Sequence, residues 1–183
     1  MMLSNTCAHP VACAFCKANL LGKVDERSRG QSLGHCSPRY CSPGEVIYRQ
    51  GQTGRFIYSV CRGLVKLDQH QSDGTQRTVR MLPPGGVFGL EALAEGTYQH
   101  SVFSVGRSRI CRIPVEVIAA LSQHEPATQS ALMKQWAQTL DEADFVIARL
   151  STGTARQRVM ALLQHLCEVD DEEGVCQAPP RDD

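Results

Sequence analysis

Short segments with the composition of β-strands, separated by turns that contain glycine, fill the region between residues 46 and 113. The segments are 46–48, 56–61, 64–67, 77–82, 101–105 and 109–113. The turns read Ser42-Pro43-Gly44, Arg62-Gly63, Ser72-Asp73-Gly74 and Pro83-Pro84-Gly85-Gly86. Many short strands at close spacing predict a barrel, a sandwich or a roll. We favour a roll because glycine lies between nearly every pair of strands.

Helical patterns replace the strand pattern after Pro114. Residues 115–121 predict a short helix, and Pro126 opens a longer one that extends to about residue 150. Its apolar residues alternate steps of three and four, which is a heptad pattern; they are Met133, Trp136, Leu140, Ala143, Ile147 and Leu150. This pattern predicts a parallel dimer interface, and the alternative is an amphipathic helix packed on its own roll.

A last helix is predicted over residues 155–167, with Thr154 as its N-terminal cap. Nothing follows this helix for it to pack against, so we expect it to belong to a second domain whose remainder is missing. The sequence therefore predicts four parts. They are a cysteine-rich arm at 1–35, a β-roll sensor domain at 36–125, a dimerisation helix at 126–150, and the start of a truncated DNA-binding domain at 151–183.

Composition and motifs exclude several classes of function. Lys plus Arg equals Asp plus Glu at 19 each, so the chain has no overall charge bias towards nucleic acid or membrane. No secretory signal and no apolar run of membrane-spanning length is visible, which predicts a cytoplasmic protein. Residues 51–55 lack the Gly-Lys-Ser/Thr of a phosphate-binding loop, and no nucleophile elbow is present. We therefore expect no enzymatic activity.

Nine cysteines in such a protein favour metal or redox chemistry over a disulfide framework. Cys7, Cys13 and Cys16 lie close together near the N-terminus, and Cys111 lies far downstream. Four thiolates from these positions form a ligand set for zinc or an iron–sulfur cluster. A set that joins two parts of the fold makes their arrangement depend on the metal.

Other uses of the cysteines stay open. Zinc bound by Cys13 and Cys16, with His9 or with His35 and Cys36, is one alternative. A thiol redox switch without metal is another, and unligated thiols on the arm are the simplest. Cys36 or Cys41 could also replace one of the four proposed ligands. Cys41, Cys61 and Cys167 lie in or beside apolar patterns, which favours packing in the core.

Three segments resemble one family of proteins: residues 43–52, 57–66 and 84–93, which read PGEVIYRQGQ, IYSVCRGLVK and PGGVFGLEAL. They are similar to the start, the next hairpin and the strand before the effector loop of the CRP/FNR family of bacterial transcription regulators. The resemblance covers about residues 40–167. It implies an α+β fold, in which a cyclic-nucleotide-binding-type β-roll (double-stranded β-helix) precedes a long dimerisation helix and the first helix of a truncated winged-helix domain.

Two departures from the family pattern affect the expected ligands and partners. Cyclic-nucleotide binders of this fold carry Gly-Glu-Leu and, after the loop, an Arg that pairs with the phosphate. Here Gly89 is followed by Leu90 and Glu91, and the later segment reads Gln99-His100-Ser101. A pocket at Gly89, Glu91, His100 and Ser101 would therefore suit some other small molecule. We also expect the helix-turn-helix to be missing, so the expected partners are a second copy of the chain, DNA only through a full-length form, and RNA polymerase.

The segment Ile110-Cys111-Arg112-Ile113-Pro114 resembles the one that supplies the fourth ligand in the family's oxygen-sensing branch, which holds an oxygen-labile [4Fe-4S] cluster. Cys7, Cys13 and Cys16 then resemble its N-terminal trio, although their gaps of five and two residues reverse the usual order. The resemblance implies a sensor of oxygen or redox state. The alternatives are a module that binds a small molecule and a dimerisation module that inhibits full-length relatives.

Overall fold

The computed structural model describes residues 35–71, 73–150 and 152–170. The arm cysteines Cys7, Cys13 and Cys16 and the tail after residue 170 lie outside the described residues. The chain forms two compact units, residues 1–135 and 136–183. Within the described residues, no helix combines the length and the apolar character needed to cross a lipid bilayer.

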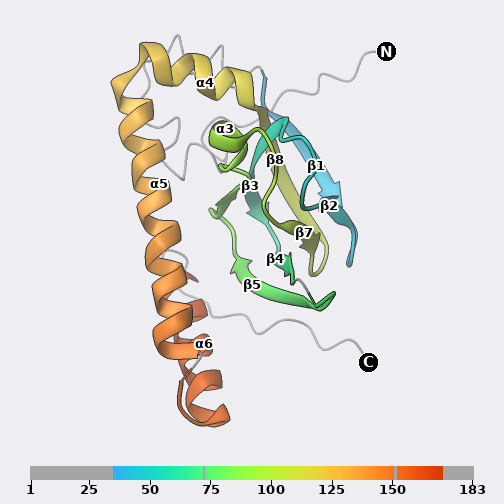
Figure 1. Ribbon diagram of the computed structural model, residues 1–183, viewed down its shortest axis with the longest axis vertical. Helices are drawn as coiled ribbons and strands as arrows, with labels where there is room; N and C mark the ends of the chain where they lie inside the picture. Colours follow the sequence, from blue (N-terminus) through green and yellow to red (C-terminus); the bar gives the residue numbers. More distant parts are fainter. Residues whose placement is uncertain (1–34, 72, 151, 171–183) are drawn as a thin grey trace. The chain divides into compact units, whose positions relative to one another are not determined.

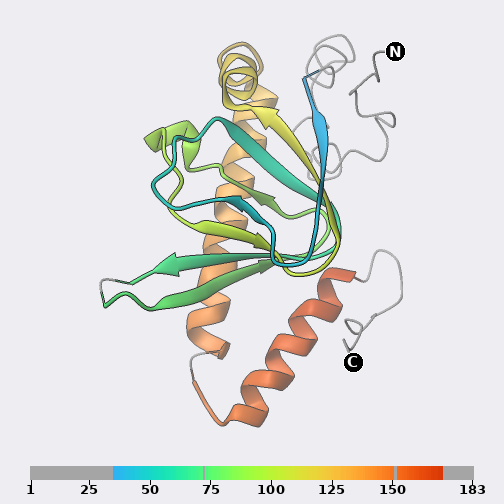
Figure 2. The ribbon, with the colours of Figure 1, turned by 90° about the vertical axis from the view of Figure 1, so that its right-hand side faces the viewer.

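Two four-stranded antiparallel sheets form a β-roll in the first unit (Figure 1). In their order within the first sheet the strands are β1 (Ser37–Cys41), β8 (Ser108–Pro114), β3 (Phe56–Arg62) and β6 (Val87–Phe88). The second sheet contains β2 (Val46–Tyr48), β7 (Ser101–Ser104), β4 (Val65–His70) and β5 (Gln76–Leu82). The β4–β5 hairpin extends to the left of the roll in Figure 2. This architecture confirms the predicted roll.

The helices follow the strands along the chain. They are α3 (Ala92–Glu95), α4 (Val115–His124), α5 (Pro126–Phe145), the π-helical segment η2 (Val146–Leu150) and α6 (Ala155–Asp170). In the first unit, α4 follows β8 directly and lies next to α3 at one end of the roll (Figure 1). Thr154 caps α6 as predicted: its Oγ1 accepts the Gln157 amide at 3.3 Å, and Gln157 Oε1 accepts the Thr154 amide at 2.8 Å. This reciprocal pair is a capping box.

The predicted strands agree with the structure to within a few residues, but two strands were not among the six predicted from the strand pattern, although the family resemblance implied a strand within residues 84–93. β1 contains Pro38, and β6 is only two residues long. β1 lies at the edge of its sheet, where a proline is tolerated because one side of the strand needs no ladder hydrogen bonds.

The long helix also differs from the prediction in one respect. The sequence predicts an uninterrupted helix to residue 150, whereas the α-helix ends at Phe145 and a π-helical segment follows. A π-helix turns less per residue than an α-helix. Ile147 lies in this segment and therefore outside the α-helical part of the heptad pattern.

Two hydrophobic clusters lie on opposite faces of the first sheet. The inner core fills the roll and contains Cys41, Ile47, Tyr48, Tyr58, Val60, Val65, Leu67, Leu82, Phe88, Ala92, Tyr98, Val102 and Ile110. The helix-side core contains Cys36, Ile57, Val87, Leu90, Cys111, Ile113, Ile118 and Leu132. Strand β8 contributes to both, because alternate side chains of a strand point to opposite faces. Ile110 is in the inner core, and Cys111 and Ile113 are in the helix-side core.

Gly63 fixes the approach of the β3–β4 turn to the start of β8. Its φ is +91°, a conformation that favours glycine. A Cβ at this position would lie 2.7 Å from the Arg107 carbonyl oxygen and 2.8 Å from the Ser108 Cα. The turn therefore packs backbone against backbone, which only glycine allows.

Substitution of Gly63 tests this close approach. We expect Gly63→Ala to lower the free energy of unfolding by about 3 kcal/mol, because it adds a steric clash to the cost of a positive φ. Gly74→Ala is the matched control, since Gly74 has φ +83° and nothing within 4 Å of its Cβ position; we expect a loss of about 1 kcal/mol. Urea denaturation measures both values, and equal losses would contradict the importance of the contact.

Candidate functional site

Gly89 and Glu91, two of the residues predicted to form an effector pocket, lie where β6 passes into α3. Gly89 has φ +81°, and a Cβ there would lie 3.1 Å from the Phe56 carbonyl oxygen. The buried Gly89 therefore packs directly against β3. Glu91 is the N-cap residue of α3, and the Gln99 amide donates to its Oε1 at 3.4 Å. The segment from Glu91 to Gln99, which contains α3 and the loop after it, therefore begins and ends beside the Glu91 carboxylate.

Aromatic rings fill the interior of the roll beside this loop. The Tyr48 ring stacks on the Tyr98 ring with centroids 3.7 Å apart, and Tyr58 stacks on Phe88 at 5.1 Å. The Tyr98 hydroxyl donates to the Phe56 carbonyl oxygen at 2.8 Å and accepts the Phe56 amide at 3.1 Å. These contacts hold the rings in fixed positions.

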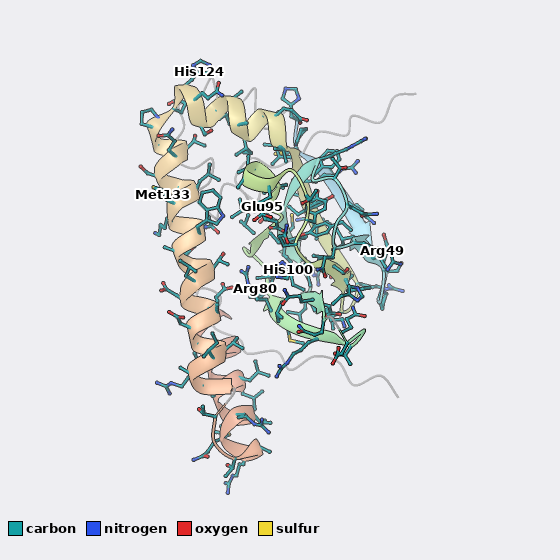
Figure 3. All side chains as sticks on the ribbon, viewed as in Figure 1. Arg49, Arg80, Glu95, His100, His124 and Met133 are labelled. Carbon is teal, nitrogen blue, oxygen red and sulfur yellow. The ribbon has the colours of Figure 1, made fainter. Side chains whose placement is uncertain are left out.

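Glu91 and Arg80 of β5 are close enough to His100 to interact with it electrostatically. Burial lowers the pKa of His100; the Glu91 carboxylate opposes that shift and the Arg80 guanidinium adds to it. The net pKa of His100 is below its usual value, so the imidazole is neutral at pH 7. Figure 3 labels His100 and Arg80 close together on the roll.

Two buried polar atoms in this region have no hydrogen-bond partner among the described residues: the Tyr48 hydroxyl and His100 Nδ1. Burial, with a contribution from Glu91, raises the pKa of Tyr48 well above its usual value, so the phenol stays neutral. Unpaired buried polar atoms are rare in native structures and call for a bound water or ligand. A neutral phenol and a neutral imidazole would therefore offer hydrogen bonds without charge.

The other predicted pocket residues have different surroundings. Ser101 is fully buried, and its Oγ accepts the Gln50 amide at 3.0 Å. Gly89 has a backbone role, as described above. The sequence analysis missed Tyr48 and Arg80, which lie on strands β2 and β5. Their proximity to Glu91 and His100 arises from strand pairing, and no local sequence motif marks it.

The proposed metal ligand Cys111 lies in the middle of β8. It is fully buried and stands opposite Pro38 of β1 and Ser59 of β3. It belongs to the helix-side core, together with Ile118 of α4 and Leu132 of α5. Cys111 is therefore part of the packing between the sheet and the helices that follow it in the first unit.

Two further cysteines lie at this face. Cys36 is buried in the helix-side core, and the half-buried Cys61 packs against that core. Within residues 35–71, 73–150 and 152–170, no group of three or more His, Cys, Asp or Glu side chains is arranged to hold a metal ion. The proposed four-sulfur set depends on Cys7, Cys13 and Cys16, so it stays a prediction.

Cys41 occupies the inner core, on the other face of the sheet from Cys111. Burial raises the pKa of its thiol, partly opposed by the nearby Arg39. A buried thiol with a raised pKa is chemically inert. This placement confirms the predicted packing role of Cys41, and the Cys167 side chain lies outside the described part.

The predicted dimer residues on the long helix are mostly exposed. The exposed fractions are 69% for Met133, 40% for Trp136, 66% for Leu140 and 66% for Ile147. Ala143 is half-buried, and the Leu150 side chain is not among those described. Exposed apolar side chains in a row are typical of a surface that packs against a partner.

Comparisons with known proteins agree with this fold. Residues 38–125 match the family model of the cyclic nucleotide-binding domain. The chain is 32% identical over 136 residues to the cyclic AMP receptor protein of Thermus thermophilus, covering 74% of this chain and 63% of that protein. It is 25% identical to the transcriptional activator protein anr of Pseudomonas aeruginosa, over 67% of this chain and 50% of the activator.

A solved structure gives the same result for the fold. The crystal structure of the Thermus thermophilus catabolite activator protein matches with a TM-score of 0.59 and 24% identity, covering 88% of this chain and 91% of that one. The chain spans between half and two thirds of the length of the two curated relatives above. These relatives are transcription regulators and not enzymes, which agrees with the expected lack of enzymatic activity. Residues 38–125 are therefore similar to the cyclic nucleotide-binding domain, and the wider chain is similar to the receptor and activator proteins above.

Proposed function

We propose that this chain is the sensory and dimerisation part of a CRP/FNR-type transcription regulator that responds to oxygen or redox state through a [4Fe-4S] cluster. Cys7, Cys13, Cys16 and Cys111 would be the ligands. DNA would be bound only by a full-length form that carries the helix-turn-helix. RNA polymerase would be a further partner of that form.

The position of Cys111 is the observation that carries this proposal. Its sulfur belongs to the same packed core as Ile118 of α4 and Leu132 of α5. Packed cores are not continuously deformable, so a change at one member shifts the others between discrete arrangements. A bond made at Cys111 would thus bias the helix that carries the predicted dimer residues.

The surroundings of Cys111 fit a metal–sulfur site. Thiolates suit iron–sulfur clusters, and burial in an apolar core restricts solvent access to the sulfur. The hydroxyl of Ser59, directly opposite on β3, is buried without a hydrogen-bond partner among the described residues. A bound [4Fe-4S] cluster would supply oxygen-sensitive redox chemistry there. Cys111 would anchor the N-terminal arm to the sheet, and release of that anchor would shift the population towards the monomer.

Replacement of Cys111 tests the site directly. We expect wild-type protein, reconstituted with iron and sulfide without oxygen, to show a broad visible absorption that bleaches in air. Cys111→Ser should lose this absorption and bound iron by about tenfold or more, because the site loses one of its four thiolates. Ultraviolet–visible spectroscopy and iron analysis measure both quantities.

Cys41→Ser is the matched control for that experiment. Cys41 is also buried in a β-strand of the first sheet, but it lies in the inner core. We expect this variant to keep the visible absorption of the wild type. A colourless wild-type protein would rule out the cluster, and equal loss in both variants would show that Cys111 has no special role.

The dimer proposal makes a separate prediction for α5. Leu140→Asp should weaken dimerisation of the anaerobic reconstituted protein by about 100-fold, since each copy would lose roughly 1.5 kcal/mol of buried leucine surface. Gln138→Asp adds the same charge at an exposed position outside the heptad pattern, and it should leave the dissociation constant nearly unchanged. Sedimentation equilibrium measures both, and a dimer of unchanged affinity in Leu140→Asp would contradict the interface.

A second candidate function is the binding of a small molecule in the roll. The unpaired Tyr48 hydroxyl and His100 Nδ1, close to Glu91 and Arg80, favour it. Glu91 and Arg80 carry opposite charges, so the site would suit a polar ligand with little net charge. A cyclic phosphate bound here would not meet the arginine that cyclic-nucleotide binders carry after the loop, because this chain has Gln99-His100-Ser101 there.

Calorimetry distinguishes this candidate from ordinary nucleotide binding. We expect no saturable heat with cyclic AMP or cyclic GMP at millimolar concentration, because Gln99-His100-Ser101 supplies no arginine and aromatic rings pack the interior. Saturable heat that is reduced in Tyr48→Phe would overturn this expectation and would place nucleotide sensing ahead of the cluster.

A further inference from the structure

Ser59 is a fully buried serine whose hydroxyl has no hydrogen-bond partner among the described residues. Other buried serines of the roll have hydrogen-bond partners for their hydroxyl groups. Ser104 Oγ donates to the Gly106 carbonyl oxygen at 2.7 Å and lies 2.8 Å from Ser108 Oγ. Ser101 Oγ accepts the Gln50 amide. Ser59 therefore bears a desolvation penalty that Ser101 and Ser104 avoid.

The strand register places Ser59 directly beside Cys111. β3 and β8 are antiparallel neighbours, and Ser59 pairs with Cys111 in their register (Figure 1). Residues directly opposite on such a pair share one face, and their Cβ atoms lie about 4.5–5.5 Å apart. That face is the helix-side core, because Cys111 belongs to it, as does Ile57, two residues before Ser59 on the same strand. The Ser59 hydroxyl and the Cys111 sulfur are thus neighbours in an apolar setting.

The chemistry of sulfur explains why a hydroxyl would be kept there. A thiol sulfur is a weak hydrogen-bond acceptor, whereas hydrogen bonds to charged groups are shorter and stronger. Hydrogen bonds to the sulfurs of an iron–sulfur cluster also set its reduction potential. The unpaired Ser59 hydroxyl would destabilise the fold when Cys111 is a thiol. It would stabilise the site by a hydrogen bond when Cys111 is a metal-bound thiolate.

We propose that Ser59 is a positioning residue that donates a hydrogen bond to the Cys111 sulfur when that sulfur is a metal ligand. The inference rests on the cluster proposed above, and it adds a residue outside the ligand set. Ser59 would stabilise the bound thiolate and slow its loss on oxidation. The same hydroxyl would destabilise the protein without metal.

Three variants test this double role. Ser59→Ala removes the hydroxyl, Ser59→Thr keeps it, and Ser104→Ala removes a buried hydroxyl that is already paired within the roll. For each variant without metal, urea denaturation gives the midpoint of unfolding. For each variant reconstituted with iron and sulfide, the loss of visible absorption gives the rate of bleaching in air.

The expected results separate Ser59 from an ordinary structural serine. Ser59→Ala should raise the urea midpoint of the metal-free protein and accelerate bleaching by about tenfold, as is typical when a partner of a metal ligand is lost. Ser59→Thr should bleach at the wild-type rate. Ser104→Ala should lower the urea midpoint and leave the bleaching rate unchanged.

The outcomes that overturn the inference differ from those that overturn the proposed function. A wild-type protein that takes up no iron rejects the cluster, and the role of Ser59 with it. A wild-type protein that forms the cluster while Ser59→Ala bleaches at the same rate rejects the role of Ser59 alone. A lower urea midpoint for metal-free Ser59→Ala also rejects it, because the hydroxyl would then have a structural partner.

Discussion

Strand β8 is the element on which the rest of the first unit depends. It pairs with β1 along one edge and with β3 along the other, so it is buried in the sheet. Its side chains alternate between two cores: Ile110 packs inside the roll, and Cys111 and Ile113 pack against the helices. A register shift by one residue would exchange these faces. The pairing of β8 therefore fixes Cys111 on the helix side of the sheet.

The turn glycines made most of this fold predictable from the sequence. Gly44, Gly63, Gly74 and Gly85 have positive φ values at the predicted turns, and the segments between them are strands. β1 could not be predicted in this way, because Ser37, Pro38 and Arg39 show no apolar alternation. It is a strand because the edge of β8 offers a ladder of hydrogen bonds. The π-helical segment after Phe145 has no sequence signal either.

The candidate sites were predictable only in part, for a related reason. Glu91 and His100 flank one loop, so a resemblance in that loop was enough to identify both. Tyr48 and Arg80 reach the same place from strands that are distant in sequence, and sheet pairing alone brings them there. Ser59 is a still harder case, because its distinguishing property is an absent hydrogen bond among the described residues. No pattern of residue types encodes a missing partner.

The two candidate sites differ in how each could affect the long helix. Tyr48 and Tyr98 belong to the inner core, which contains no residue of α4 or α5 among its buried members. Cys111 shares the helix-side core with Ile118 and Leu132, so the proposed bond at its sulfur would act on packing that includes both helices. A ligand in the roll would reach α4 through the partly buried Val115, which packs against the inner core, whereas Cys111 belongs to a core that contains buried residues of both helices. Allosteric coupling requires an element whose arrangement both sites bias, and under the proposal the helix-side core would be that element for Cys111. This shared packing is the physical reason why we propose Cys111 as the sensing residue.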